Sequence, residues 1–224
     1  MVMLKLKRLY YGVKTKSKAY QHFLTAPLLA QSADYRRMEF LALDLETTSL
    51  DANKGEIVSL GFVPIVCGLI DIQQGFSTLI RNKKTVGMSA TLHGISDREA
   101  ATGATMEEVF PILLEALRGR VLLLHHGDLD MAFLQHSCRR LYGTPFLAQV
   151  VDTMLLEWQR LRRQNKVVQP QALRLYQCRQ RYGLPDYPAH DAYADALATA
   201  ELLLAQAAAM AGNDNLPLRG LCRV

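Results

Sequence analysis

The sequence predicts an α/β protein in which helices flank a mixed sheet, and three observations support this prediction. Short apolar runs, typical of buried strands, come first along the chain, and compact apolar runs then alternate with helical patterns. The composition, 50% hydrophobic and 21% charged, is ordinary for a soluble globular protein. A chain of 224 residues suffices for one sizeable domain, expected over 38–211, with an N-terminal arm, 1–37, and a tail, 212–224.

The N-terminal segment 1–37 is strongly basic, and we expect it to form a partly helical arm. It holds eight lysines and arginines against one acid, Asp34, and aromatic side chains are interspersed among them. Because the whole chain carries a net charge of +5, the remainder is slightly acidic. Such an arm fits a polyanionic partner, either nucleic acid or lipid headgroups, although a solvated helix face would have the same composition.

Three strands are expected at the start of the domain. Residues 38–44 form a short apolar run that ends in an acid, which is typical of a buried strand with functional residues at its tip. Residues 56–65 and 69–80 are the second and third strands, separated by a turn around Cys67 and Gly68. Three strands in succession indicate an antiparallel meander.

Strands and helices alternate in the second half of the chain. Thr105 and Glu108 form a capping box that opens a helix through about Leu117. Short strands are expected at 121–124 and 150–152, and helices at about 128–142, 153–164, 171–182 and 191–211. The tail 212–224 is expected to be loosely held.

Several protein classes find no support in the sequence. No apolar run is long enough to span a bilayer, and the basic N-terminus is not followed by the apolar core of an export signal. The four cysteines are scattered, without a CxxC pair or a histidine at zinc-ligand spacing. A reducing cytoplasm is the simplest location consistent with these features.

The first candidate site is the sequence Asp44-Leu-Glu46 at the end of the first strand. Residues i and i+2 of a strand point to the same side, so the two carboxylates are expected side by side. Adjacent carboxylates repel each other, and a divalent cation such as Mg²⁺ or Mn²⁺ removes that conflict. A solvated acidic turn would produce the same short pattern, so this motif alone is weak.

The second candidate site follows the apolar strand at 121–124. Asp130 is expected to face the first cluster, whereas Asp128 suits an N-cap or first-turn position of the helix. His125 and His126 lack zinc-ligand spacing and are expected to be ordinary residues at the strand end.

The third candidate site is the sequence His190-Asp191-Ala-Tyr-Ala-Asp195. Asp191 is well placed as a helix N-cap, and Asp195 lies one turn later. His190 precedes the helix, in a loop, where a neutral imidazole near bound cations would serve as a base.

The order and spacing of these motifs are more specific than any one of them. Asp44-x-Glu46-Thr-Thr, a histidine five residues before Asp130, and His190-x-x-x-x-Asp195 together resemble the DEDDh subgroup of 3′–5′ exonucleases. The likeness is strongest to the proofreading epsilon subunit of bacterial DNA polymerase III and its stand-alone relatives. It covers about residues 38–208 and includes a His-Gly-Ile loop at 92–97 and the Asp-Thr pair at 152–153.

The resemblance implies an RNase H-like fold, with a mixed five-stranded sheet flanked by helices, and two Mg²⁺ or Mn²⁺ ions held by four acids. Asp44 would bridge both ions, Glu46 and Asp195 would complete one site, and Asp130 would hold the other through water. His190 would deprotonate the attacking water.

The resemblance also implies contacts with the terminal nucleotide. By position these are Thr47, Thr48, Leu50 and His93, although plain loop packing would equally explain Leu50. The chain departs from the family pattern at three places: Ser49 replaces a glycine, His126 an asparagine and Leu129 a phenylalanine. All four acids and the histidine are present, so we expect activity.

Several functions remain open from the sequence. The main hypothesis is a 3′–5′ exonuclease acting on single-stranded DNA, and the rival is the same chemistry on RNA, as in ribonuclease T or oligoribonuclease. A catalytically silent nucleic-acid-binding module is a third interpretation. A polymerase or another replication or repair protein is a candidate partner, and the arm is a candidate membrane or protein docking segment.

Overall fold

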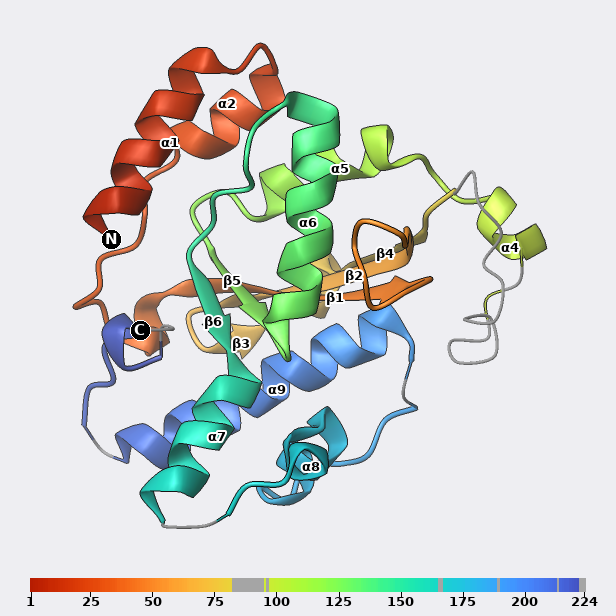
Figure 1. Ribbon diagram of the computed structural model, residues 1–224. Helices are drawn as coiled ribbons and strands as arrows, with labels where there is room; N and C mark the ends of the chain where they lie inside the picture. The colour runs from red at the N-terminus through yellow and green to blue at the C-terminus, as the bar shows by residue number, and fades with distance from the viewer. Residues whose placement is uncertain (82–94, 96, 165–166, 189, 213, 222–224) are drawn as a thin grey trace.

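A six-stranded mixed sheet lies between two layers of helices (Figure 1). The computed structural model describes residues 1–81, 95, 97–164, 167–188, 190–212 and 214–221. The strands are β1 (Glu39–Thr47), β2 (Ile57–Val66), β3 (Leu69–Ile70), β4 (Phe76–Leu79), β5 (Val121–Leu124) and β6 (Val150–Asp152). The helices are α1 (Val2–Lys14), α2 (Lys18–Thr25), α4 (Asp97–Ala101), α5 (Met106–Ala116), α6 (Gly127–Tyr142), α7 (Thr153–Arg163), α8 (Leu175–Gln180) and α9 (Ala192–Ala211).

The sheet has the order β3-β2-β1-β5-β6, with β4 also paired to β2. β1 is antiparallel to β2 and parallel to β5, so the expected meander and the mixed sheet are both confirmed. The expected third strand is divided into β3 and β4, so the described residues form six strands rather than five. Its interruption is a short turn in which the Asp71 carboxylate accepts hydrogen bonds from the backbone N–H groups of Gln73 and Gln74.

The alternation of side chains along β1 decides which helices meet the site. The leucines at odd positions, Leu41–Leu45, belong to the apolar cluster that includes side chains of α5 and α6. Phe40 and Ala42 belong to the opposite cluster, with residues of α9. Since side chains of equal parity share a face, Asp44 and Glu46 follow Phe40 and Ala42 toward α9.

Most expected helices occur close to their predicted bounds, with one exception. The segment predicted as a helix over 171–182 is a 3-10 turn, Pro170–Leu173, followed by α8. Arg174 between them is extended, with ψ 146°, and the carbonyl of Leu173 meets the His125 ring instead of a helical N–H. Local propensity was therefore overridden by these contacts.

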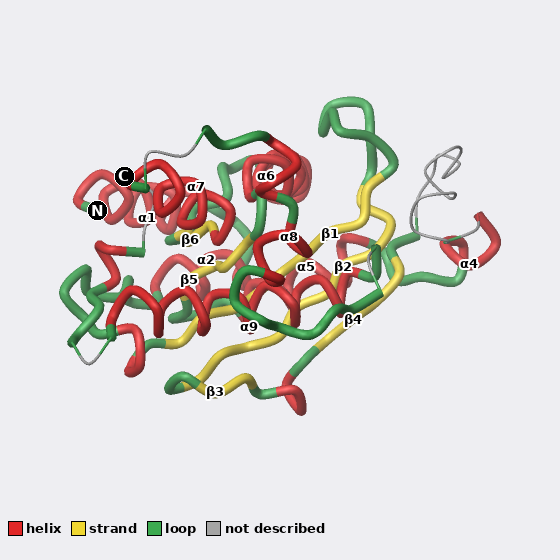
Figure 2. Tube along the Cα trace, turned by 90° about the horizontal axis from the view of Figure 1, so that it is seen from below, coloured by secondary structure: helices red, strands yellow, loops and turns green. Residues whose placement is uncertain are grey.

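Helix α9 lies across the strands of the sheet, as Figure 2 shows from below. Within the described residues it is the one helix long and apolar enough to cross a membrane, and half of the relevant window is buried. Its alanines and leucines pack against the sheet, which is the arrangement of a core helix.

Residues 1–37 pack on the domain instead of extending from it (Figure 1). Tyr20 and Phe23 belong to the same apolar cluster as Phe110 and Phe146. Arg8, 5% exposed, donates hydrogen bonds to the carbonyls of Leu147, Phe23 and Ala26. The expected partly helical segment is thus α1 and α2, and both contribute to the core or hold side chains against it.

The C-terminal segment is also held in place, so the expectation of a loose tail is wrong for the described residues 214–221. Leu218 donates a backbone hydrogen bond to Ala33, and Tyr35 donates one to Leu216. Leu218 and Leu221 are buried. The described C-terminal residues are therefore tied to the segment that precedes β1.

Candidate active site

Three acidic side chains meet at the C-terminal end of β1. One carboxylate oxygen from each of Asp44, Glu46 and Asp195 lies within 4.8 Å of the others. Asp44 and Glu46 come from alternate positions of β1, and Asp195 comes from the first turn of α9. The structure therefore brings together three of the four acids that the sequence singled out.

A glycine on β2 allows α9 to approach this closely. Gly61 pairs with Asp44 across the β1–β2 ladder. A Cβ atom at Gly61 would lie 2.4 Å from the backbone of Ala192 and Tyr193, so the first turn of α9 rests directly on the strand. This contact fixes the distance between Asp195 on the helix and Asp44 beside the glycine.

The start of α9 is capped as the sequence predicts. The Asp191 carboxylate accepts a hydrogen bond of 2.8 Å from the backbone N–H of Ala194. The Asp195 carboxylate accepts one of 3.0 Å from the backbone N–H of His190. Asp191 is therefore a helix cap, whereas Asp195 links the cluster to the loop that carries His190.

Asp130 lies near the cluster but comes from a different helix. It lies in the first turn of α6 and is 5% exposed. It is not one of the three acids within 4.8 Å, but its charge raises the pKa of Asp44. Asp128 lies in the first turn of the same helix, as expected, and is exposed.

Burial and mutual repulsion perturb all four carboxyl groups. Burial first, and then the charges of Asp130 and Asp195, raises the pKa of Asp44 well above its usual range. Burial, with Asp195 and Asp191, raises the pKa of Glu46 to about 7. Burial also raises the pKa values of Asp130 and Asp195.

The set of donor atoms fits a divalent metal centre. Four buried or partly buried carboxyl groups close to one another are unfavourable as four anions, unless protons or cations neutralise them. Hard oxygen donors of this kind suit Mg²⁺ or Mn²⁺ rather than a thiolate- or imidazole-binding metal. The acidic cluster is thus compatible with divalent metal binding.

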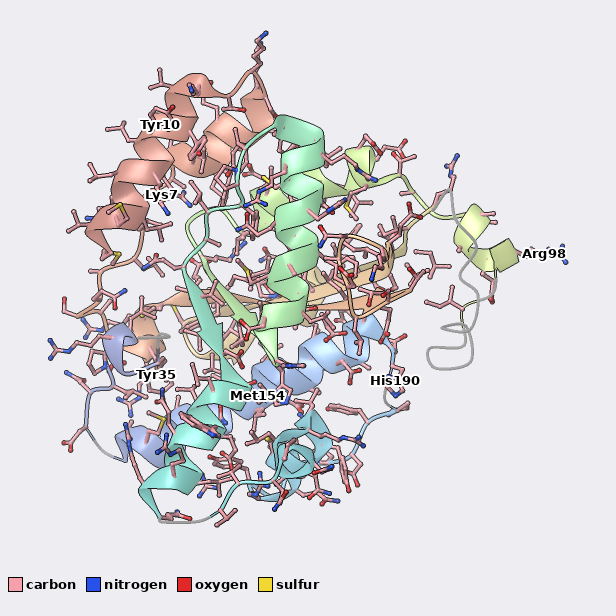
Figure 3. The ribbon with its side chains drawn as sticks, in the orientation of Figure 1. Lys7, Tyr10, Tyr35, Arg98, Met154 and His190 are labelled. Atoms are coloured by element: carbon pink, nitrogen blue, oxygen red, sulfur yellow. The ribbon has the colours of Figure 1, made fainter. Side chains whose placement is uncertain are left out.

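His190 lies on the loop that enters α9 (Figure 3). It is exposed and has a left-handed backbone, with φ 68°. The same loop is anchored upstream, because the buried guanidinium of Arg179 donates to the carbonyl of Pro185 and to Glu201. Tyr187 donates to the same Glu201 carboxylate, so both ends of the loop are tied to α9.

Of the two histidines after β5, His125 has a structural role. The His125 ring lies 2.8 Å from the hydroxyl of Thr153 and 2.9 Å from the carbonyl of Leu173, which occupies both ring nitrogens. Burial lowers the pKa of His125 to about 4, so it is neutral. His126 has a left-handed backbone, φ 64°, which is a conformation that Asn and His adopt more readily than most residues. That conformation explains how His126 stands where the family has asparagine.

The loop after β1 is braced by its own polar side chains. Thr47 donates from its hydroxyl to the carbonyl of Ser49, and the Thr48 hydroxyl accepts from the N–H of Glu56. Ser49 caps the N–H of Asp51. Leu50 projects from this loop with 86% of its surface exposed. The fourth predicted substrate contact, His93, lies outside the described residues.

Asp152 is a residue whose role at the site the sequence did not reveal. It is 5% exposed, and its carboxylate accepts from the N–H groups of Gly127 and Met154 at 2.9 and 2.8 Å. One side chain thus caps both α6 and α7 and fixes the turn that carries Asp130. The signal in the sequence was only an acid at the end of a strand, before Thr153.

The comparisons with known proteins agree with this geometry. The model of the exonuclease family RNase_T matches residues 41–203, which is most of the chain. The chain therefore belongs to this exonuclease family, and the predicted likeness to DEDDh exonucleases is confirmed.

Several relatives of the chain are named as bacterial DNA polymerase III proteins. The chain is 30% identical over 174 residues to the subunit epsilon-like protein of Rhodobacter capsulatus, covering 75% of this chain and 23% of that protein. It is 27% identical over 176 residues to subunit epsilon of Aquifex aeolicus, covering 74% and 78%. The match to the PolC-type polymerase of Thermotoga petrophila, 26% identical over 177 residues, covers 79% of this chain but 12% of that protein. The chain thus spans a small part of the PolC-type relatives.

Solved structures of similar fold are exonucleases. The nuclease domain of 3′hExo, a DEDDh family member bound to rAMP, has a TM-score of 0.63 at 17% identity, covering 77% of this chain and 92% of that one. Escherichia coli Exonuclease I in complex with a dT13 oligonucleotide has a TM-score of 0.63 at 15% identity, covering 75% and 40%. These likenesses confirm the predicted RNase H-like exonuclease fold.

Proposed function

We propose that this protein is a metal-dependent exonuclease that removes nucleotides from the 3′ end of single-stranded DNA. The observation that carries the proposal is the meeting of Asp44, Glu46 and Asp195 within 4.8 Å, with buried Asp130 beside them. Four carboxylates this close repel one another if nothing neutralises them, and two divalent cations would remove that repulsion.

Each side chain has a distinct proposed role. Asp44 would serve both of two Mg²⁺ or Mn²⁺ ions, Glu46 and Asp195 would complete the ligands of one, and Asp130 would help to hold the second. Bound cations of this kind lower the pKa of the attacking water and stabilise the leaving 3′ oxygen. His190, exposed on its loop above Asp195, would accept the proton of that water.

The loop after β1 would position the terminal nucleotide. Thr47 and Thr48 would present backbone and hydroxyl groups to it, and Leu50, being 86% exposed, would pack against the base. His93 would contact the same nucleotide. Packing of a base against Leu50 would remove apolar surface from water, so the exposed leucine would contribute to binding of the nucleotide.

RNA is the competing substrate. Among the similar structures, Exonuclease I is in complex with dT13, whereas the 3′hExo domain is bound to rAMP. Among the described residues, none is identified by its contacts as a reader of the 2′-hydroxyl, the group that differs between the two substrates. We favour DNA because the named relatives are DNA polymerase III proteins, which also suggest a polymerase as partner and the cytoplasm as location.

A matched set of oligonucleotides tests the proposal. Single-stranded DNA and RNA of one sequence, labelled at the 5′ end, are incubated with Mg²⁺, with Mn²⁺ and with a chelator. We expect a ladder that shortens from the 3′ end, faster on DNA, and no product with the chelator. His190→Ala should lower the rate by about 10²–10⁴-fold, and Asp44→Asn by at least about 10²-fold.

Asp128→Asn is the matched control, because it removes an acid from the same region without touching the cluster. It should keep the rate within about threefold of the unchanged protein. Undiminished hydrolysis by Asp44→Asn, or in excess chelator, would overturn the metal mechanism. If the unchanged protein binds the DNA and RNA oligonucleotides but hydrolyses neither, it would be a catalytically silent nucleic-acid-binding module instead.

A further inference from the structure

A groove between α1 and the C-terminal end of α6 has the character of a nucleic-acid-binding surface. We propose that it binds single-stranded nucleic acid several nucleotides from the 3′ end that occupies the candidate active site. This inference rests on the proposed function for the identity of the strand, and its test measures binding separately from hydrolysis.

Two adjoining hollows make up the groove. One, of about 590 Å³, is lined by Tyr10, Lys14, Lys16 and Tyr142, among others. The other, of about 510 Å³, is lined by Lys7, Gln135, Arg139 and Pro145, among others. Tyr11, Gly143 and Thr144 line both hollows, so the two lie next to each other at the C-terminal end of α6.

The charge of the groove is uniformly positive. Lys7, Lys14, Lys16 and Arg139 are all exposed, and neither hollow has an acid in its lining. In the described part of the chain none of these four cations forms an ion pair with a carboxylate. Cations gathered without counter-charges suit the phosphates of a strand, which bind with release of counterions.

Aromatic rings lie between these cations. Tyr10 is 53% exposed and packs edge-on against Tyr11, with ring centroids 5.0 Å apart. Tyr142, partly exposed, is backed by the ring of buried Tyr20 at 5.3 Å. Interleaved cations and tyrosines are the combination by which proteins hold single strands without reading sequence, since any base can stack.

The groove is held rigidly before any ligand arrives. Arg8, from the face of α1 opposite the solvent, is bound to three backbone carbonyls and lies 4.6 Å from the ring centre of Phe23. Figure 3 shows Lys7 and Tyr10 on this anchored helix. A surface ordered in advance loses little entropy on binding.

Helix α6 sets the distance between groove and active site. Asp130 lies in its first turn and Tyr142 at its end, so the two are about 18 Å apart at ~1.5 Å per residue. This span corresponds to about five nucleotides at the ~3.4 Å spacing of a stacked strand. A third hollow, of about 330 Å³, lies between α6 and the loop after β1, and its lining includes His136 and Arg140 but also Glu56 and Glu107.

An anionic membrane is the alternative occupant, because α1 also carries exposed apolar residues. Val2, Leu6, Leu9 and Val13 are 56–80% exposed and share one side of the helix. Those residues line neither hollow, whereas the groove itself is polar and aromatic. The lining therefore favours a nucleic-acid strand, which can enter a hollow, over the surface of a bilayer, which cannot.

Binding of fluorescent oligothymidylates in chelator tests the proposal. We compare a 5-mer and a 20-mer on the unchanged protein and on the triple variant Lys7→Gln, Lys14→Gln, Arg139→Gln. We expect the 20-mer to bind at least about tenfold more weakly to the variant, with a salt slope smaller by about 2. The 5-mer should bind equally to both. Tyr10→Ser should weaken the 20-mer by about tenfold.

A second triple variant controls for net charge: Arg118→Gln, Arg162→Gln, Arg219→Gln, all exposed and outside the groove. Circular dichroism verifies that all variants fold. Unchanged 20-mer binding, or an equal loss in both triple variants, overturns the proposal. If the unchanged protein binds phosphatidylserine vesicles and the groove variant does not, while the variant still binds the 20-mer, the groove is a membrane-binding surface and the proposal is wrong. Strand binding without hydrolysis by the unchanged protein would instead overturn the proposed function.

Discussion

Glu46 is a single residue whose ionisation should destabilise the folded protein when no metal is bound. Its pKa is about 7 because the side chain is buried near Asp195 and Asp191. Burial, and then the charges of Asp130 and Asp195, also raise the pKa of Asp44 well above its usual range. In an unfolded chain these carboxyl groups would ionise near pH 4. In the folded protein they hold their protons to higher pH, so forcing them to ionise there lowers the free energy of unfolding.

The sign of this linkage gives a prediction for the metal-free protein. A carboxyl group whose pKa is raised on folding stabilises fully below its unfolded pKa, and that contribution is lost as pH rises toward the folded value. In chelator we therefore expect the melting temperature to fall between about pH 4.5 and pH 7. Mg²⁺ or Mn²⁺ should restore it at pH 8. Asp44→Asn should flatten the fall, and a melting temperature that rises over this interval would contradict the assignment.

The placement of several candidate site residues was predictable because each follows a local rule. Alternation in a strand places Asp44 beside Glu46, and capping propensity identifies Asp191 as a helix cap. Asp152 was not predictable as a double cap, because Gly127 lies 25 positions away in the chain. Which backbone groups a buried carboxylate reaches is a property of tertiary structure, not of its neighbours in sequence.

At the scale of elements, the site depends on how closely α9 approaches β2. Gly61 is the point of contact, and its partner in the ladder is Asp44. The position of Asp195 relative to β1 is therefore set by a residue that carries no functional group.

Gly61→Ala should displace the first turn of α9. The added Cβ would lie 2.4 Å from backbone atoms, which cannot move aside as a side-chain tip can. We expect a loss of about 10²-fold in hydrolysis, as for a catalytic group displaced by ~1 Å, together with a lower melting temperature. Gly12→Ala is the control, because its Cβ would meet Leu24 at an ordinary 3.8 Å. Full activity of Gly61→Ala would show that the approach of α9 is not limiting.

Element boundaries were predicted well where propensity and packing agree. The capping box at Thr105 opens α5 at Met106, and the apolar runs at 121–124 and 150–152 are β5 and β6. The two errors, at 69–80 and 171–182, arise where side chains bind the backbone. Asp71 interrupts the strand, and contacts of the Leu173 carbonyl with His125 and Cys178 interrupt the helix.

At the scale of the whole molecule, the basic N-terminal segment is part of the core. Composition revealed its charge, but its anchoring depends on pairs distant in sequence, such as Arg8 with Leu147, 139 residues apart. Deleting residues 1–37 would therefore expose Phe110 and Phe146, which pack against Tyr20 and Phe23. Loss of nucleic-acid binding after such a deletion would report unfolding as readily as a missing phosphate contact.

Comparing Arg8→Ala with Lys7→Ala separates these two effects. Arg8 is buried and holds α1 to the core, whereas its neighbour Lys7 is exposed in the lining of the groove. Arg8 is 5% exposed and satisfies three carbonyls, and burial lowers its pKa to about 10. Truncation leaves those carbonyls without their charged donor, so we expect a loss of about 3 kcal/mol in urea unfolding. Lys7→Ala should change the unfolding free energy by less than ~0.5 kcal/mol. If both substitutions are equally mild, α1 is only loosely attached, and the rigid groove that the binding proposal requires does not exist.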